Sequence, residues 1–292
     1  IKVDAAGIDR GTWHLLYGLP RLVRLALGLR RPRQQVPGLD VCGTVTAVGP
    51  GETGFEVGDR VFGIAAGSLA EFAVAKSAKL APATTELSSE QWAALGISGL
   101  TALQSLEAAG VSASERVLVV GASGGVGSYA VQLAAHLGAE VTAVCRGSKA
   151  DAVRAWGATE VIDREQFDPT KIGRPFDQII DIAGGTPAKT WRRILTETGT
   201  TVFVGNDTGG PWTGGFFRPA FEAIKAKFRK DHYVMLVSAE DGADLRRLAE
   251  YVSTGALLPH VHTTFPLGET AAAIELLESG AATGKIVVSL RP

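Results

Sequence analysis

The chain has 292 residues, of which 46% are hydrophobic and 20% charged, and its formal net charge is −1. These values indicate a globular protein with room for two domains of ordinary size, and they lack the basic excess that marks a nucleic-acid-binding protein. No apolar run reaches the ~20 residues that a membrane-spanning helix needs. The two cysteines, Cys42 and Cys145, are too few for a disulfide framework or a four-thiolate zinc site, and they favour a cytoplasmic protein.

Residues 1–86 have the pattern of an all-β module. Strand-like runs at 41–48, 60–64 and 69–75 alternate with turn signals rich in glycine. The segment 15–29 is instead rich in leucine and arginine. We expect a short helix there after Pro20, with its arginines either solvated or in contact with phosphates.

Residues 88–110 predict a helical connector. Ser88 or Ser89 can cap this helix, and Gln91 completes a capping box if Ser88 is the cap. Gly96 and Gly99 are expected to break or bend it.

From Arg116 onward, strands and helices alternate, which is typical of a doubly wound parallel α/β sheet. The expected strands are 117–120, 140–145, 161–163, 177–181, 200–204 and 233–237, and the expected helices are 126–137, 150–156, 188–195 and 241–253. The stretch 207–231 interrupts this order, and we interpret it as a mobile cover or an interface element. The tail returns to the first pattern, with strands at 263–267 and 285–290 around a helix at 269–278.

The stretch 116–146 carries the main functional signal. A buried strand, a glycine-rich turn, an amphipathic helix and a second strand follow one another as a complete β-α-β unit. Glycines let the backbone approach a ligand closely, and a helix N-terminus favours an anionic pyrophosphate. The frame Ala122-x-Gly124-x-x-Gly127 therefore predicts dinucleotide binding, and a purely structural tight turn is the alternative. The residues expected at the pyrophosphate are Ser123, Gly124, Gly125, Val126 and Gly127.

The residues after the second strand select the dinucleotide. An acid at this point would bind the ribose 2′-hydroxyl of NAD, whereas cations accommodate a 2′-phosphate. Here Arg146, Ser148 and Lys149 follow the strand, and no acid occurs before Asp151. Arginine and lysine side chains pair with phosphate, and serine adds a hydrogen bond. The segment therefore predicts NADPH, unless these are ordinary solvated loop cations.

Three ordered segments, PGLDVCGTVTAVGPGETGFEVGDRVFG, ISGLTALQSL and VLVVGASGGVG, resemble the medium-chain dehydrogenase/reductase superfamily, and the chain is similar to its zinc-free quinone oxidoreductase branch. Within that branch it resembles the NADPH oxidoreductases of the reticulon-4-interacting-protein type. The resemblance implies a GroES-like β domain at 1–86, rejoined by 257–292, and a Rossmann domain at 87–256. It also implies a missing first hairpin before Ile1 and a homodimer paired through the sheet edge near 233–237.

The resemblance also implies site residues. Thr101 matches a threonine near the nicotinamide, and Arg164 replaces a tyrosine that flanks the adenosine phosphate. Ile182-Ala183-Gly184 and Val204-Gly205-Asn206 match loops that border the nicotinamide ribose. Lys285 matches a C-terminal lysine that often reaches the cofactor cleft.

The family's zinc ligands have no counterparts here. The Gly-His-Glu motif of the zinc branch reads Gly38-Leu39-Asp40, and Asp9 stands where that branch has a cysteine. Metal-free reduction needs groups that polarise a carbonyl or donate a proton. Asp9, His14 and Tyr17 are the candidates, and a satisfied polar loop residue is the alternative for each.

Two functions remain open. The first is an NADPH-dependent, zinc-independent oxidoreductase that transfers hydride to a quinone, enone or related carbonyl substrate. The second is a non-catalytic, NADPH-binding redox-sensing protein with a degenerate active site, which the changed residues around Asp9 favour.

Overall fold

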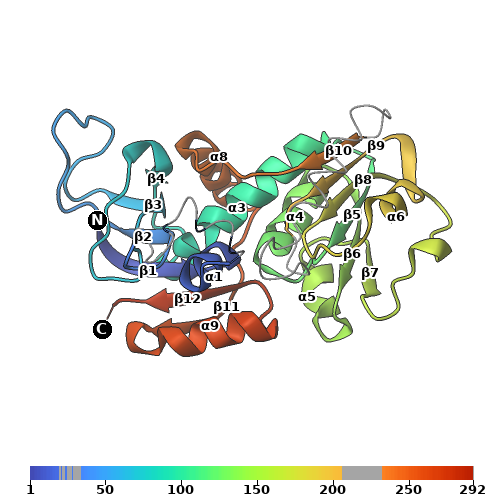
Figure 1. Ribbon diagram of the computed structural model, residues 1–292. Helices are drawn as coiled ribbons and strands as arrows, with labels where there is room; N and C mark the ends of the chain where they lie inside the picture. The colour runs from blue at the N-terminus through green and yellow to red at the C-terminus, as the bar shows by residue number, and fades with distance from the viewer. Residues whose placement is uncertain (20, 22–23, 25–27, 29–33, 206–231, 292) are drawn as a thin grey trace. The chain divides into compact units, whose positions relative to one another are not determined.

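The computed structural model describes residues 1–19, 21, 24, 28, 34–205 and 232–291 (Figure 1). Contacts within the chain divide it into two compact units, Ile1–Leu100 with Ala239–Pro292, and Thr101–Ser238. Helix α3 (Ser89–Ala109) runs from the first unit into the second. The domain boundaries expected after residue 86 and before residue 257 stay a prediction.

The first unit contains a six-stranded sheet in the order β11-β12-β1-β2-β3-β4. All neighbouring pairs are antiparallel except β11 with β12, which is parallel. The C-terminal strand thus lies beside the first one, and Gly7 is paired with Val287. The strands are β1 (Lys2–Ile8), β2 (Asp40–Thr44), β3 (Arg60–Ile64), β4 (Leu80–Pro82), β11 (Val261–Pro266) and β12 (Lys285–Ser289).

Two strand predictions in this unit were too long. The strand expected at 41–48 ends at Thr44, although Val45 still exchanges backbone hydrogen bonds with Gly58 and Asp59 just beyond it. The run 69–75 forms only isolated bridges, Lys2 with Phe72 and Ala66 with Val74. Two apolar clusters pack against the strands of this sheet.

The helices of this unit are α1 (Arg10–Tyr17), α8 (Gly242–Ser253) and α9 (Thr270–Ser279), with short 3-10 turns η2 (Ser77–Lys79) and η5 (Leu267–Glu269).

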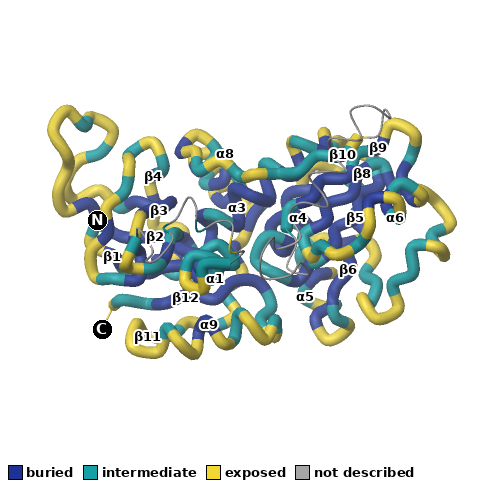
Figure 2. Tube along the Cα trace, in the orientation of Figure 1, coloured by how far each residue is buried: buried dark blue, intermediate teal, exposed yellow. Residues whose placement is uncertain are grey.

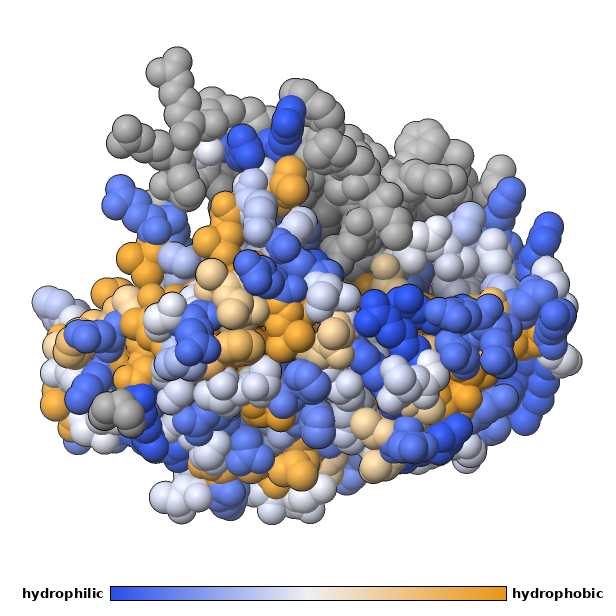
Figure 3. Space-filling model, turned by 90° about the horizontal axis from the view of Figure 1, so that it is seen from below, coloured by the Kyte–Doolittle hydropathy of each residue, from blue (hydrophilic) through white to orange (hydrophobic). Residues whose placement is uncertain are grey.

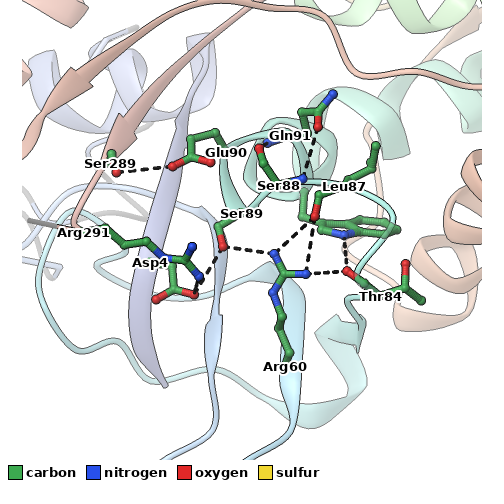
Figure 4. Close-up of polar contacts among 11 residues, drawn as sticks. Asp4, Arg60, Thr84, Leu87, Ser88, Ser89, Glu90, Gln91, Ser289 and Arg291 are labelled. Atoms are coloured by element: carbon green, nitrogen blue, oxygen red, sulfur yellow. Dashed lines mark hydrogen bonds and ion pairs between the residues drawn. The ribbon is translucent and has the colours of Figure 1, made fainter.

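The start of α3 is anchored by a polar network (Figure 4). Ser88 and Gln91 exchange hydrogen bonds, each backbone N–H donating to the other side chain, which confirms the predicted capping box. Arg60 of β3 donates to the Ser89 hydroxyl at 3.0 Å and to the carbonyl oxygens of Thr84 and Leu87. Farther along α3, the backbone bends at Gly96, as expected, with φ −40° and ψ −105°.

The second unit contains a six-stranded sheet in the order β10-β9-β8-β5-β6-β7, and every neighbouring pair is parallel. The predicted doubly wound Rossmann sheet is therefore confirmed. The strands are β5 (Arg116–Val120), β6 (Glu140–Cys145), β7 (Glu160–Asp163), β8 (Phe176–Asp181), β9 (Leu195–Phe203) and β10 (His232–Met235). The helices are α4 (Gly125–His136), α5 (Ala150–Ala155) and α6 (Ala188–Arg192), with 3-10 turns η3 (Gly147–Lys149) and η4 (Pro169–Lys171).

The strands of this parallel sheet are buried, because the helices that connect parallel strands cover its faces. Figure 2 shows β5 in the buried colour throughout, and its five residues are all inaccessible to solvent or nearly so. Strands covered on both faces read as continuous aliphatic runs. Trp191 of α6 is fully buried in the apolar cluster on one face of the sheet, beside Phe176 and Leu195.

The described surface is mixed. On the face drawn in Figure 3, hydrophobic residues are scattered among hydrophilic ones. None of the helices that the structure describes has both the length and the apolar character that crossing a bilayer requires.

Candidate functional site

The glycine turn after β5 has the geometry of a dinucleotide-binding turn. Gly121 has φ +89°, a conformation that glycine adopts readily, so it supplies the tight turn although alanine follows at position 122. A Cβ on Gly127 would lie 2.3 Å from the Gly121 carbonyl oxygen, so only glycine lets α4 pack this close to β5. Gly124 caps α4 and has no side chain to accept from the first helical turn. The N–H groups of that turn are therefore left to other acceptors, such as a phosphate.

The carboxyl edge of the sheet collects the other expected cofactor residues. The strand order reverses between β5 and β8, and ligands of open α/β sheets bind outside the strands' carboxyl ends at such a point. The glycine turn follows β5, Arg146 follows β6, and Ile182 and Val204 follow β8 and β9. Asn206 lies outside the described residues.

Three cations gather at the end of β6. Arg146 begins the turn η3, and the Arg164 amide donates to the Cys145 carbonyl oxygen at 2.7 Å. Lys149 is buried, and burial lowers its pKa, with Arg146 and Arg164 lowering it further. Ser148 lies between Arg146 and Lys149 and is exposed. The structure therefore brings Arg146, Lys149 and Arg164 together, at the point where the sequence predicts a 2′-phosphate.

The cluster also has an acid beside it. A Cβ on Gly147 would lie 2.4 Å from the Asp163 Oδ2 atom, so that carboxylate lies against η3. Asp163 contributes to raising the pKa of the neighbouring Cys145 thiol, after burial. Arg146, Lys149 and Arg164 thus outnumber the acid that lies against the turn, and an excess of positive charge favours an anion.

The turn after β8 is attached to the end of β5. Ile182 and Ala183 both donate their amide hydrogens to the Val120 carbonyl oxygen, at 3.0 and 3.2 Å. The Val204 amide donates to the carbonyl oxygen of Asp181, the last residue of β8, at 2.9 Å. The loop after β9 is therefore held to the end of β8. Gly205 lies close to this turn, since a Cβ there would meet the Ile182 carbonyl oxygen at 2.8 Å. Thr101 lies on α3, five residues beyond the bend, and is 9% exposed.

The three catalytic candidates lie on or beside α1 in the first unit. Asp9 is the N-cap of this helix, and its Oδ1 accepts from the Thr12 amide at 2.7 Å. Its Oδ2 is buried and has no hydrogen-bond partner among the described residues. The His14 Nδ1 atom lies 2.9 Å from the Leu19 carbonyl oxygen and so carries a hydrogen. Sequence reasoning missed α1, although Asp9 followed by an amphipathic octapeptide was a usable signal.

The rings of Tyr17 and Trp13 lie side by side, and both side chains donate a hydrogen bond to Glu278. Tyr17 is 47% exposed, and its hydrogen bond to Glu278 raises the pKa of the phenol. The Trp13 indole donates to Glu278 Oε1 at 2.6 Å, and the Trp13 and Tyr17 rings lie 5.1 Å apart. Glu278 is thus held by two donors, which lower the pKa of its carboxyl group.

Lys285 forms a buried ion pair in the first unit. Its Nζ lies 3.0 Å from Asp40 Oδ2 and 3.1 Å from Ser98 Oγ, and its side chain is 2% exposed. Asp40 Oδ1 accepts from the Ile97 amide just beyond the bend in α3. The structure thus places Lys285 with Asp40 and Ser98, and its expected role at the cofactor stays a prediction.

Within the described part of the chain, no group of three or more His, Cys, Asp and Glu residues could hold a metal ion. His260 directly precedes β11, and His262 lies within it. Burial lowers the pKa of His260, and the charge of His262 lowers it further.

Comparisons with known proteins agree with this architecture. Residues 1–85 match the alcohol dehydrogenase GroES-like domain, and residues 156–288 match the zinc-binding dehydrogenase domain. The chloroplast envelope quinone oxidoreductase homolog of Arabidopsis thaliana is 30% identical over 302 residues, which cover 99% of this chain and 88% of that protein. The mitochondrial NAD(P)H oxidoreductase RTN4IP1 of Mus musculus is 32% identical over 323 residues, covering 99% and 81%.

Solved structures show the same fold. The quinone oxidoreductase from Coxiella burnetii has a TM-score of 0.86 at 28% identity, covering all of this chain and 90% of that one. A mycobacterial protein complexed with NADPH has a TM-score of 0.82 at 26% identity, covering 99% and 90%. The chain therefore belongs to the medium-chain dehydrogenase/reductase superfamily, in its quinone oxidoreductase-like branch.

Proposed function

We propose that this protein is an NADPH-dependent, zinc-independent oxidoreductase that transfers hydride to a quinone, an enone or a related carbonyl compound. The observation that carries the proposal is the cation cluster at the end of β6. Lys149 is buried there beside Arg146 and Arg164, and the three charges repel one another. A phosphate bound among them would relieve that repulsion through charge-assisted hydrogen bonds.

The rest of the cofactor site is consistent with a dinucleotide. The first turn of α4 would bind the pyrophosphate, with Ser123, Gly124, Gly125 and Val126 around it and Gly127 behind it. Thr101, Ala183, Val204, Gly205 and Asn206 are proposed for the nicotinamide half, and Lys285 for the cleft. When bound, NADPH supplies the hydride.

The chain's own groups would manage charge and protons. Asp9 offers a buried carboxylate oxygen to a hydrogen-bond donor of the cofactor or substrate. His14 and Tyr17 are proposed as proton donors, and the Tyr17 phenol, whose pKa is raised by its hydrogen bond to Glu278, carries its proton at neutral pH. Leu39 stands where the zinc branch has a histidine, which supports a reaction without zinc. A homodimer through β10, an edge strand of its sheet, and a cytoplasmic location belong to the same proposal.

Turnover tests the function directly. Purified protein should oxidise NADPH with 1,4-benzoquinone or 9,10-phenanthrenequinone, and a metal chelator should leave the rate unchanged. Protein that binds NADPH but reduces none of a panel of quinones and enones would instead support the redox-sensing function. Loss of activity with the chelator, restored by zinc, would contradict the metal-free mechanism.

The 2′-phosphate pocket is tested by Arg146→Ala. A charge-assisted hydrogen bond contributes about 1.5–3 kcal/mol, so the dissociation constant for NADPH should rise by roughly tenfold to a hundredfold. NADH lacks the 2′-phosphate, and its affinity should change little. Lys171→Ala, which removes an exposed cation from η4, is the matched control. Equal losses for both cofactors would refute the pocket.

A further inference from the structure

Asp181, at the carboxyl end of β8, is a fully buried acid that the proposed reaction does not use. Its Oδ1 accepts from the Gly184 amide at 2.9 Å, and its Oδ2 accepts from the Trp191 indole N–H at 2.9 Å. The Asp181 side chain therefore links Gly184, in the turn after β8, to Trp191, the buried residue of α6. It lies beside the point where the strand order reverses, between β8 and β5.

Both partners of Asp181 are hydrogen donors, which explains why a carboxylate is present. An ionised carboxyl group is an acceptor at both oxygens, whereas asparagine or a protonated acid would set a donor against one of the two N–H groups. The ionised form is therefore the one that accepts most strongly from Gly184 and Trp191 together, with no hydrogen of its own to place. The pKa of Asp181 is raised to about 6, because burial outweighs the hydrogen bonds from Gly184 and Trp191, which lower it.

Charged neighbours do not offset this burial. The turn 182–187 has no ionisable side chain. Besides Asp181 itself, the charged residues of the three neighbouring strands are Arg116 in β5, Asp177 in β8 and Glu197 in β9. Each lies four or more residues before the end of its strand, and it is the strand ends that lie beside Asp181. Helix α6 carries Lys189 and Arg192, and Arg192 donates to the Thr196 carbonyl oxygen. None of the ion pairs found within the described ranges includes Asp181.

The turn that Asp181 holds lies at the expected cofactor crevice. Gly184 has φ +68°, and its amide is fixed by the carboxylate. The turn also packs on the first residue of the glycine turn, since a Cβ on Gly121 would lie 3.1 Å from the Ala183 nitrogen. A dinucleotide lies across the reversal point with one half on each side. With the phosphate cluster on the β6 side, the nicotinamide half falls on the β8 side, over this turn.

We propose that Asp181 is a positioning residue for the cofactor, whose ionised carboxylate holds the Ile182–Gly184 turn in the shape that accepts the nicotinamide half. This inference rests on the proposed dinucleotide site. When Asp181 takes up a proton, one of its two hydrogen bonds is lost and the turn loosens. The adenosine half, bound on the β6 side, is unaffected.

Calorimetry with two ligands tests this. NADP⁺ contacts both halves of the site, whereas adenosine 2′-monophosphate contacts only the adenosine half, and the ratio of their affinities cancels the titration of the shared 2′-phosphate. In the wild type this ratio should fall roughly tenfold between about pH 7 and about pH 5, because one unit below its pKa a group is ionised in about one molecule in ten.

Two variants separate positioning from folding. In Asp181→Asn the ratio should be low and independent of pH, with binding of adenosine 2′-monophosphate unchanged from the wild type. In Trp191→Phe, the lost indole N–H should raise the pKa of Asp181, so the midpoint of the pH dependence should move upward.

The remaining outcomes overturn one proposal or the other. An unchanged ratio in Asp181→Asn, or a wild-type ratio that is flat with pH, would overturn the role of Asp181. Loss of both ligands in Asp181→Asn alone would show that the residue is merely structural. If the wild type binds neither ligand, the proposed cofactor site itself fails.

Discussion

At the scale of residues, Lys285 and Asp40 form a pair that is costly to bury, because both charges are removed from water. Burial raises the pKa of Asp40, and Lys285 is the main group that lowers it. Removing one partner of a buried pair leaves an uncompensated charge. Lys285→Met should therefore destabilise the protein by about 3–5 kcal/mol at alkaline pH, where Asp40 is ionised, measured by denaturant unfolding. Lys2→Met, at an exposed lysine of β1, is the control.

The pH dependence of that loss gives a second check on the same pair. Without Lys285 the pKa of Asp40 in the folded state rises further above its unfolded value, so the folded state binds the proton more tightly. The penalty is present above that folded pKa and fades as the pH falls through it. A loss below about 1 kcal/mol, or one that grows in acid, would contradict this account of the pair.

At the scale of elements, the turn between β5 and α4 allows a matched pair of substitutions. A Cβ on Gly127 would clash with the Gly121 carbonyl oxygen, whereas the nearest atom to a Cβ on Gly124 is that same oxygen at 3.6 Å. Gly124 also has φ −84°, which alanine adopts freely. Gly124→Ala should therefore fold normally but hinder a pyrophosphate that approaches the backbone. Gly127→Ala should lower the thermal midpoint as well as cofactor affinity. The prediction fails if both variants lose stability equally.

Elements whose signal is local could be predicted from the sequence. β6 was predicted at its observed bounds, and β5 within one residue, because both are short, mainly apolar runs next to glycine-containing turns. The capping box at Ser88 is likewise a local pattern. By contrast, the point at which β2 ends depends on its pairing with another part of the chain, the turn at Asp59 that precedes β3. The residues after Thr44 do not show this by themselves.

The candidate site was predictable to the same extent. Arg146 and Lys149 follow their strand directly, so their clustering could be read from the chain, whereas Arg164 was placed only by the family resemblance. The partners of Lys285 could not be inferred, since Asp40 lies 245 residues away in sequence and only the sheet order brings β12 close to β2. Nor did any pattern indicate that Asp181 accepts from Trp191, because both residues have the appearance of core positions.

At the scale of the whole molecule, each unit has its own apolar core and one cysteine. Cys42 is buried in β2 of the first unit, and Cys145 is buried at the end of β6 in the second. Burial raises the pKa of Cys42 to about 12, and it also raises that of Cys145. Thiol reagents attack the thiolate, so each cysteine should react only when its own unit opens. The two thiols therefore report on the two units separately.

Cofactor binding should protect these thiols unequally. The proposed site belongs to the second unit, and a ligand at about 100 times its dissociation constant stabilises the state that binds it by about 2.7 kcal/mol. NADP⁺ at that level should slow labelling of Cys145 about a hundredfold, and slow labelling of Cys42 far less. Single-cysteine variants, Cys42→Ala and Cys145→Ala, allow each rate to be followed with a chromogenic disulfide. Equal protection of both thiols would mean that the units open as one cooperative structure, because binding energy gained in one would then stabilise the other.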